Sequence, residues 1–347
     1  MRPEGRVAPA LQGEGTMRAG LIDLASARLG GRAMLANDEF FAPKTNLVKP
    51  HPAVFIAGKY TVRGKWMDGW ETRRRRTPGH DWCVVRLGVP GVIHSVIVDT
   101  RHFRGNHPES CSIDAVALRG DAGVVRLRAL GNRGGWLELL PRHPLAGDTE
   151  NEFPVTSDMR ATHVRLNIYP DGGVARLRVF GAARPDWERL RAQRGRVDLI
   201  AAQHGGVPLA ASDEFFSHPL NLVMPGRPTD MGDGWETRRR RGPGHDWVVL
   251  RLGHRGTIEE VVVDTTHFKG NFPESCRLEA CDAPGLPADA VPEDGAPWRE
   301  LLRRTRLRPD TPHRFRAIGR SGPVTHVRLS IFPDGGVARL RLFGKPV

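Results

Sequence analysis

The stretch HVRLNIYPDGGVARLRVFG, residues 163–181, returns almost unchanged as HVRLSIFPDGGVARLRLFG at residues 326–344. The two copies share 16 of 19 positions, which indicates a repeated structural unit rather than a short motif. Val164, Leu166 and Ile168 alternate with polar residues, and this period of two is typical of a β-strand. The Pro-Asp-Gly-Gly sequence that follows predicts a tight turn, and residues 174–180 predict the returning strand.

The repetition extends outward from this stretch over most of the chain. DGWETRRRRTPGHDW at residues 68–82 matches residues 233–247 in 14 of 15 positions. DEFF at residues 38–41 returns at residues 213–216. The first copy carries about ten extra residues near 49–66, which predict a longer surface loop.

The repeat predicts how the chain is divided into domains. We expect two copies of one domain, at residues 21–181 and 196–347, joined by a polar linker at residues 182–195. Residues 1–20 have no counterpart and are rich in Gly, Pro and Arg, so we expect a disordered tail there.

Each copy has the sequence pattern of an all-β domain. Residues 82–87, 92–99 and 162–168 are rich in residues that favour strands, and turn-forming residues flank each of them. Long helical periodicity is missing, and only a short helix near residues 21–29 is expected. Antiparallel strands with turn signals about every ten residues predict a sandwich or jelly roll, here two jelly rolls in tandem.

Composition limits the classes of protein to which the chain can belong. The 347 residues carry 52 Lys and Arg against 39 Asp and Glu, a net charge of +13. Only six of the basic residues are lysines, a bias typical of a GC-rich genome, and the charge is spread along the chain, so we do not infer a nucleic-acid partner. With no run of 18 apolar residues, no secretory signal and only four cysteines, we expect a cytoplasmic protein that has reduced thiols and no membrane span.

Three polar clusters at predicted strand ends occur in both copies. In the first cluster, arginines follow a carboxylate along an extended segment, an arrangement suited to binding a planar anion; a solvated, ion-paired strand is the alternative. Its members are Asp68, Trp70, Glu71, Arg73, Arg75, His80 and Asp81, with Asp233, Trp235, Glu236, Arg238, Arg240, His245 and Asp246 as their repeats.

The second cluster combines an imidazole, an amide and carboxylates on one loop. Such a set suits acid/base catalysis, although the same residues could ligate a metal or only cap the turn. Its members are Asp99, His102, Asn106 and Glu109, with Asp264, His267, Asn271 and Glu274 as their repeats. The HxH and HExxH spacings are absent, so no metal site is assigned, and a divalent metal is not excluded.

The third cluster surrounds the tight turn. Tyr169 becomes Phe332 in the second copy, so the two copies do not share its hydroxyl group. Cys111 and Cys276 occupy equivalent positions at the start of a strand, where we expect burial. Signatures of serine hydrolases, P-loop kinases and dinucleotide enzymes are absent from their required contexts.

Taken together, these motifs resemble the allantoicase family. The matching stretches include LIDLASARLGG, ANDEFF, GKWMDGWETRRRR and VDTRHFRGNHPES, as well as RLNIYPDGGVARLRVFG and the second-copy counterparts. The resemblance covers nearly everything after residue 20. It implies two galactose-binding-like jelly rolls, a homo-oligomer, and hydrolysis of allantoate to ureidoglycolate and urea in allantoin breakdown.

The resemblance suggests roles for the clustered residues. We expect His102 with Glu109, and His267 with Glu274, to act as acid and base. Arg73, Arg75, Arg238 and Arg240 are candidates for binding the substrate carboxylate, and Asp68, Glu71 and Asn106 for binding ureido groups. The competing interpretation is a non-catalytic tandem module that binds carbohydrate or another polar ligand. Polyanion binding through the arginine runs is a third interpretation.

Overall fold

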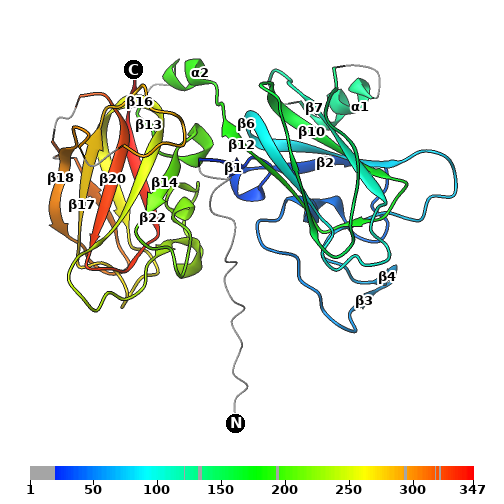
Figure 1. The fold of residues 1–347 in the computed structure, drawn as a ribbon, viewed down its shortest axis with the longest axis horizontal. Helices are drawn as coiled ribbons and strands as arrows, with labels where there is room; N and C mark the ends of the chain where they lie inside the picture. Colours follow the sequence, from blue (N-terminus) through cyan, green and yellow to red (C-terminus); the bar gives the residue numbers. More distant parts are fainter. Residues whose placement is uncertain are drawn as a thin grey trace, which may run out of the picture. The chain divides into compact units, whose positions relative to one another are not determined.

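The computed structural model describes residues 20–347 except 121, 132–134, 193–194, 293–294, 317 and 320–321. The tail predicted at residues 1–20 lies outside this part, apart from Gly20. The chain forms two compact units, the first mainly from Leu21–Trp187 and the second mainly from Glu188–Ala201 and Gly206–Val347 (Figure 1). The predicted linker contains the short helix α2 (Trp187–Ala192).

The first unit is an antiparallel β-sheet with strand order β1-β12-β6-β10-β7-β8, and β2 and β9 also pair with β6. Its main strands are β1 (Ile22–Asp23), β2 (Arg32–Ala36), β6 (Asp81–Asp99), β7 (Ser110–Val116), β8 (Leu137–Pro144), β9 (Glu150–Pro154), β10 (Arg160–Tyr169) and β12 (Arg176–Ala183). The smaller strands are β3 (Tyr60–Thr61), β4 (Gly64–Lys65), β5 (Trp70–Glu71) and β11 (Gly173–Val174). The helices are η1 (Ala27–Leu29), η2 (Lys44–Val48) and α1 (Val124–Leu130).

The long strand β6 connects the two layers of this unit. Its first residues, Asp81–Arg86, pair with β10, and its last residues, Ser95–Asp99, pair with β9 and β12. Because β6 changes partners midway, one hydrogen-bonded sheet folds into two facing layers with a shared core. Both ends of β6 therefore lie at the same end of the sandwich, next to the loops that carry the predicted polar clusters.

The predicted period of two is confirmed in β10, where Val164, Leu166 and Ile168 are fully buried. The returning strand predicted after the turn is present as β11 and β12, but it does not pair with β10: β10 pairs with β6 and β7, whereas β12 pairs with β1 and β6. The Pro170–Gly173 turn instead carries the chain from one layer to the other. Local sequence shows that a turn is present, but the partner of the returning strand depends on long-range packing.

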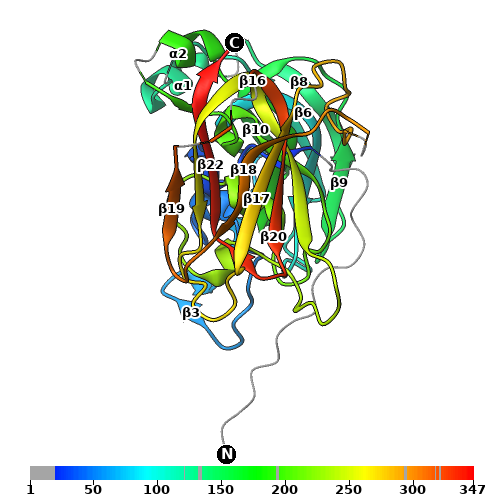
Figure 2. The ribbon, with the colours of Figure 1, turned by 90° about the vertical axis from the view of Figure 1, so that its left-hand side faces the viewer.

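The second unit repeats the same topology, with strand order β13-β22-β16-β20-β17-β18 and with β14 and β19 also paired to β16. Its strands are β13 (Val197–Asp198), β14 (Val207–Ala211), β15 (Trp235–Glu236), β16 (Asp246–Asp264), β17 (Ser275–Cys281), β18 (Arg299–Arg306), β19 (Pro312–Phe315), β20 (Val324–Phe332), β21 (Gly336–Val337) and β22 (Arg339–Pro346). The 3-10 helices are η3 (Ala202–His204), η4 (Pro219–Val223) and η5 (Met231–Asp233). Figure 2 shows β18, β17 and β20 side by side in this unit.

The predicted all-β fold class, two tandem jelly-roll sandwiches of antiparallel strands, is confirmed. Of the short helix expected near residues 21–29, only the 3-10 helix η1 at its end forms, and the segment begins with the strand β1. A methyl group on Gly31 would lie 1.9 Å from the carbonyl oxygen of Ala25, so this turn requires glycine. Within the described residues, no helix is long and apolar enough to cross a membrane.

Candidate functional site

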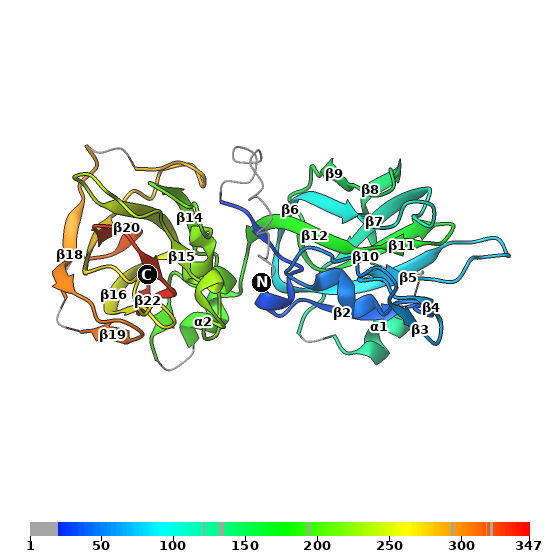
Figure 3. The ribbon, with the colours of Figure 1, turned by 90° about the horizontal axis from the view of Figure 1, so that it is seen from below.

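The three predicted polar clusters meet at one end of each sandwich. In the first unit, the amide of Thr72 donates to the carbonyl of Gly172 (3.1 Å), and the amide of Gly173 donates to the carbonyl of Asn106 (2.8 Å). A methyl group on Gly173 would lie 2.0 Å from the Phe103 ring, so only glycine allows this approach. Figure 3 shows β5 and β11, the strand pair that joins these loops.

Asp68 is buried beneath this end in an ion pair with Arg176. Its Oδ2 lies 2.6 Å from Nη2 of Arg176, and its Oδ1 lies 2.8 Å from Nζ of Lys49. Burial acts to raise the pKa of Asp68, but hydrogen bonds from Lys49 and Arg176 outweigh it and hold the pKa below its usual range. Asp233 forms the equivalent pair with Arg339 at 2.7 Å. Each carboxylate thus pairs with a guanidinium group on a main strand of its own sandwich.

Glu71 and Asn106 come together across two loops. Nδ2 of Asn106 donates to Oε1 of Glu71 at 2.7 Å, and Asn271 makes the same contact with Glu236 at 2.5 Å. Burial raises the pKa of Glu71, while Asn106 and the charge of Lys65 oppose this rise. A carboxyl group with a raised pKa, held by an amide at the rim of the sandwich, can donate a proton.

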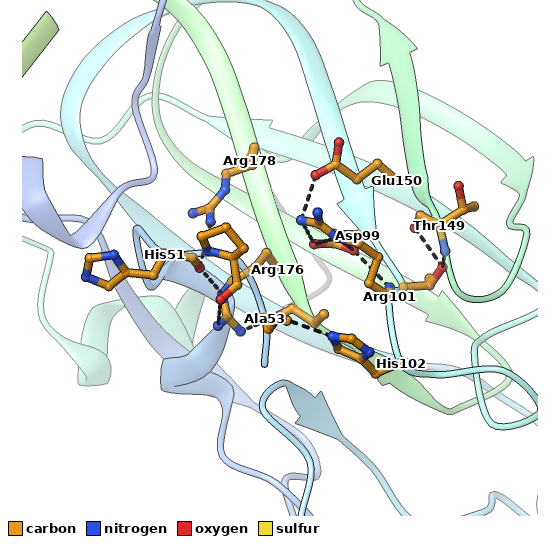
Figure 4. Close-up of polar contacts among 12 residues, drawn as sticks. His51, Ala53, Asp99, Arg101, His102, Thr149, Glu150, Arg176 and Arg178 are labelled. Carbon is orange, nitrogen blue, oxygen red and sulfur yellow. Dashed lines mark hydrogen bonds and ion pairs between the residues drawn. The ribbon is translucent and has the colours of Figure 1, made fainter. Parts of the chain in front are cut away.

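His102 is held by the inserted loop of the first repeat. Its Nε2 lies 3.1 Å from the carbonyl oxygen of Ala53 (Figure 4). Its ring stacks on Phe55 with centroids 5.9 Å apart. Because a carbonyl can only accept, Nε2 donates in this contact, and Nδ1 is the ring nitrogen left to accept a proton. His267 makes the same contact with Pro228 at 3.1 Å.

The backbone at both histidines is unusual. His102 has φ 72° and His267 has φ 73°, in the left-handed region that non-glycine residues seldom adopt. The amide of His102 donates to Oδ1 of Asp148 at 2.8 Å, and that of His267 donates to Asp310 at the same distance. The second cluster is therefore a loop of fixed conformation in both repeats.

The remaining carboxylates of the second cluster lie apart from the histidine rings. Asp99 is paired with Arg101 at 2.6 Å, as Figure 4 shows. Glu109 is exposed, and in the described part of the chain its side chain has no hydrogen bond to His102. Glu274 is also exposed and lies 3.7 Å from Arg306. The structure thus does not join the predicted His–Glu pairs through a direct hydrogen bond.

The arginines of the first cluster already have carboxylate partners. Nη2 of Arg73 lies 2.6 Å from Asp38, and Nη1 of Arg75 lies 3.5 Å from Asp81. In the second unit, Arg238 lies 3.5 Å from Asp213, and Arg240 pairs with Asp246. Arg73 and Arg238 are exposed, whereas Arg75 and Arg240 are half-buried beside a histidine. Asp38 and Asp213 belong to the repeated DEFF motif, the sequence signal that could have identified these partners.

His80 lies beside a further set of polar side chains, on the face of the sheet that points away from the core. Its ring packs on Tyr169 with centroids 4.7 Å apart, and His245 packs on Phe332 at 4.6 Å. Burial, together with the charges of Arg165 and Arg75, lowers the pKa of His80 although Asn167 acts to raise it. No local sequence pattern singles out Asn167, because its neighbours on the sheet face come from strands that are distant in sequence.

The described residues contain no group of three or more His, Cys, Asp or Glu side chains placed to hold a metal ion. Cys111 and Cys276 are fully buried, as expected, and burial raises the pKa of each thiol to about 12. Neither thiol is therefore suited to act as a nucleophile.

The chain matches a family model described as the allantoicase repeat twice, over residues 22–184 and 197–347. It is 49% identical over 327 residues to a probable allantoicase of Pseudomonas aeruginosa, covering 94% of this chain and 96% of the relative. It is 50% identical to probable allantoicase 2 of Burkholderia pseudomallei, covering 93% and 94%. The crystal structure of allantoicase from Saccharomyces cerevisiae is similar, with a TM-score of 0.79, 34% identity and coverage of 95% of this chain and 94% of that one. Motifs, fold and relatives agree: the chain belongs to the allantoicase family.

Proposed function

We propose that this protein is an allantoicase that hydrolyses allantoate to ureidoglycolate and urea, with proton transfer at Glu71 of the first repeat, the counterpart of Glu236 in the second. The observation that carries the proposal is the Glu71–Asn106 pair, a half-buried carboxyl group of raised pKa held by an amide. Membership of the family supports the substrate. The hydrogen bond holds the pair at the end of the sandwich, and this fixed position supports the assignment of Glu71 as the proton donor.

The chemistry of allantoate requires an acid. Its central carbon carries a carboxylate and two ureido groups, and urea leaves only when its departing nitrogen gains a proton. In the proposal, the Glu71 carboxyl gives that proton and the C–N bond breaks, with its electron pair going to the urea nitrogen. The remaining ureido nitrogen forms a C=N bond and gives its own proton to a base. Water then adds across this bond: its oxygen joins the carbon and the base returns a proton to the nitrogen, which gives ureidoglycolate. The proton that the water gives up passes from the base through solvent to the Glu71 carboxylate.

The water that adds must lose a proton to a base. Because Nε2 of His102 donates to Ala53, Nδ1 is the ring atom able to accept this proton. Glu109 and Glu274, as first predicted, remain the alternative bases on the same loops. Substitutions can distinguish the two candidate bases, because the histidine is held by contacts with its own unit whereas the glutamates are exposed.

Arg75 and Arg240 are proposed to bind the substrate carboxylate. Each is half-buried, so its charge is less screened by solvent than that of Arg73 or Arg238. His80 and His245 lie at the same end of the sandwich and complete the proposed binding surface. The proposal also includes a homo-oligomer, which sedimentation of the purified chain would test.

The test is urea release from allantoate by the purified full chain, with and without prior chelation. We expect chelator-insensitive release that falls at least about a hundredfold in the Glu71→Gln/Glu236→Gln double variant. The Glu109→Gln/Glu274→Gln variant tests the alternative bases, which are exposed carboxylates at the same end. A small loss is expected if the histidines are the bases, and a large loss would assign that role to the glutamates.

Two results would overturn parts of this proposal. A loss of less than tenfold in the His102→Ala/His267→Ala variant would remove the histidines as bases. No urea from a folded sample under either condition would make a tandem binding module the leading interpretation.

A further inference from the structure

The inserted loop of the first repeat carries a hairpin that lies beside the proposed proton donor. Its two short strands, β3 and β4, pair Tyr60–Thr61 with Gly64–Lys65. A methyl group on Gly64 would lie 3.7 Å from the Phe41 ring, so β4 contacts this ring. The amide of Phe41 in turn donates to the carbonyl oxygen of Glu71 at 3.2 Å. The hairpin therefore packs against the segment that is bonded to Glu71.

Lys65, at the end of this hairpin, lies near both the proposed acid and the proposed base. Its Nζ is 4.5 Å from the centroid of the Phe55 ring, and the same ring stacks on His102, with centroids 5.9 Å apart. Phe55 thus contacts both side chains. Burial raises the pKa of Glu71, and the positive charge of Lys65 is close enough to oppose that rise.

The ammonium group of Lys65 is available to a bound molecule. The other two lysines of the loop are engaged, because Lys49 forms an ion pair with Asp68 at 2.8 Å and Lys59 lies 3.9 Å from the centroid of the Trp66 ring. Lys65 is exposed, and within the described part of the chain its Nζ donates no hydrogen bond to a protein atom. Its three N–H groups can therefore donate to a substrate.

The second repeat has no counterpart of this lysine. Lys65 stands three positions before Asp68, whereas Asp230 stands three positions before Asp233. The carboxylate of Asp230 accepts a hydrogen bond from the amide of Asp233 at 3.1 Å and caps η5, so this segment is a 3-10 turn and not a hairpin. Arg227 of the same loop instead precedes the residue whose carbonyl contacts the second histidine. The hairpin lysine is thus a feature of the first repeat.

The leaving group of the proposed reaction gains from a positive charge near Glu71. When the C–N bond breaks, its electron pair goes to the ureido nitrogen and is shared with the adjacent carbonyl oxygen. This oxygen is two bonds from the nitrogen that Glu71 protonates, so a group that binds it must lie close to Glu71. A cation placed where negative charge develops lowers the barrier, because it stabilises the transition state more than it stabilises the substrate.

We propose that Lys65 is a further catalytic residue of the first repeat, whose ammonium group donates a hydrogen bond to the carbonyl oxygen of the departing ureido group. Lys65 keeps its proton throughout, and the proton that completes urea comes from Glu71. The inference rests on the proposed function. It gives Lys65 a part in bond cleavage, which differs from the binding of the substrate carboxylate proposed for Arg75.

The test is steady-state urea release by the full chain carrying Lys65→Met, which removes the charge and keeps a long side chain. We expect kcat to fall at least about tenfold while KM changes less than about threefold. Lys59→Met is the matched control, because it removes an exposed lysine of the same loop, and it should keep the rate of the unaltered chain. Lys65→Arg retains the charge and should lose less activity than Lys65→Met.

The pH dependence separates an electrostatic role of Lys65 from a structural one. Because the charge of Lys65 opposes the rise in the pKa of Glu71, Lys65→Met should raise that pKa further. The alkaline limb of kcat/KM should then move to higher pH, since the acid works while it is protonated. Lys59→Met should leave the limb in place.

The possible failures are distinguishable from one another. An active chain in which Lys65→Met keeps its rate, or in which Lys59→Met loses as much, would overturn this inference and leave the proposed function standing. The same holds for a loss confined to KM, which would mean equal binding of substrate and transition state, and for an alkaline limb that does not move to higher pH. Absence of urea release from the unaltered chain would overturn the proposed function, and this inference with it.

Discussion

The two repeats share the buried contacts at the end of the sandwich, but they differ on the outer face of the sheet. Both bury a tryptophan whose indole donates to a backbone carbonyl, from Trp70 to Asp38 at 2.8 Å and from Trp235 to Asp213 at 2.9 Å. Both also bury an aspartate–arginine pair. On the outer face, however, the hydrogen-bonded residues Ser112, Asn167 and Tyr169 of the first repeat are replaced by Arg277, Ser330 and Phe332 in the second. The difference shows that the buried contacts were preserved after the duplication, while the side chains on the outer face diverged.

A second difference is the inserted loop of the first repeat. Its Lys65 acts on Glu71, its Phe55 stacks on His102, and its His51 accepts a hydrogen bond from Nε of Arg176 at 2.9 Å. Nε of Arg339, the equivalent of Arg176, is buried with no partner among the described residues. The loop therefore completes the first site in a way that the second repeat does not reproduce.

The largest expected effect would show which repeat carries the reaction. Because the inserted loop surrounds Glu71 and His102, we expect Glu71→Gln alone to reduce the rate of urea release about a hundredfold or more. We expect Glu236→Gln alone to reduce it less than tenfold. Steady-state assays of both single variants make the measurement. Equal losses would mean that both repeats turn over substrate.

The next largest effect concerns stability. Asp68→Ala leaves the Arg176 guanidinium buried without its carboxylate, and we expect the free energy of unfolding to fall by about 3–5 kcal/mol. Lys49→Met, which installs the residue of the second repeat, should cost about 1 kcal/mol or less because Lys49 is half-exposed. Denaturant unfolding of the two variants measures both costs. Similar costs would contradict a central role for the buried pair.

The same pair also predicts acid sensitivity. The pKa of Asp68 is held below its ordinary value of 3.8, so the stabilisation is present above that pH. It should be lost as the pH falls through the lowered pKa, and the Asp68→Ala variant should lack this component of acid unfolding.

A smaller effect is expected in the pH profile of the reaction. Asn106 lowers the pKa of Glu71, so Asn106→Ala should raise that pKa further. An acid works while it is protonated, so the alkaline limb of kcat/KM should move to higher pH. Asn271→Ala is the matched variant in the second repeat and should leave the limb in place. A shift to lower pH in Asn106→Ala would rule out Glu71 as the acid.

The smallest effect tests the divergent face. Tyr169→Phe removes the hydrogen bond to Ser112 and should lower the free energy of unfolding by about 1 kcal/mol. Phe332→Tyr adds a hydroxyl where Ser112 is replaced by Arg277, so it should not stabilise the second unit. Thermal unfolding of both variants makes the comparison. A gain in stability from Phe332→Tyr would mean that the two faces are more alike than their contacts indicate.

Much of the candidate site could be predicted from the sequence, because its residues lie in long identical motifs. Glu71 and Asn106 each lie at the end of a predicted strand, so the strand pattern predicts that they come close together. The repeated motifs single out the carboxylates as well as the arginines, but which carboxylate pairs with which arginine could not be predicted. Asp38 binds Arg73 from 35 positions away, and Asp68 binds Arg176 from 108 positions away. No local pattern encodes such pairs.

The sequence by itself determined the duplication, the β-strands and the identity of the polar loops, because strand periodicity and turn chemistry are properties of neighbouring residues. Only the tertiary structure decided that the strand after the Pro170–Gly173 turn crosses to the other layer. It also decided that Glu109 is exposed and lacks a hydrogen bond to His102, and that Arg277 lies beside Ser330. Strand partners and ion pairs are chosen by burial and packing over the whole unit, and these depend on residues far apart in the chain.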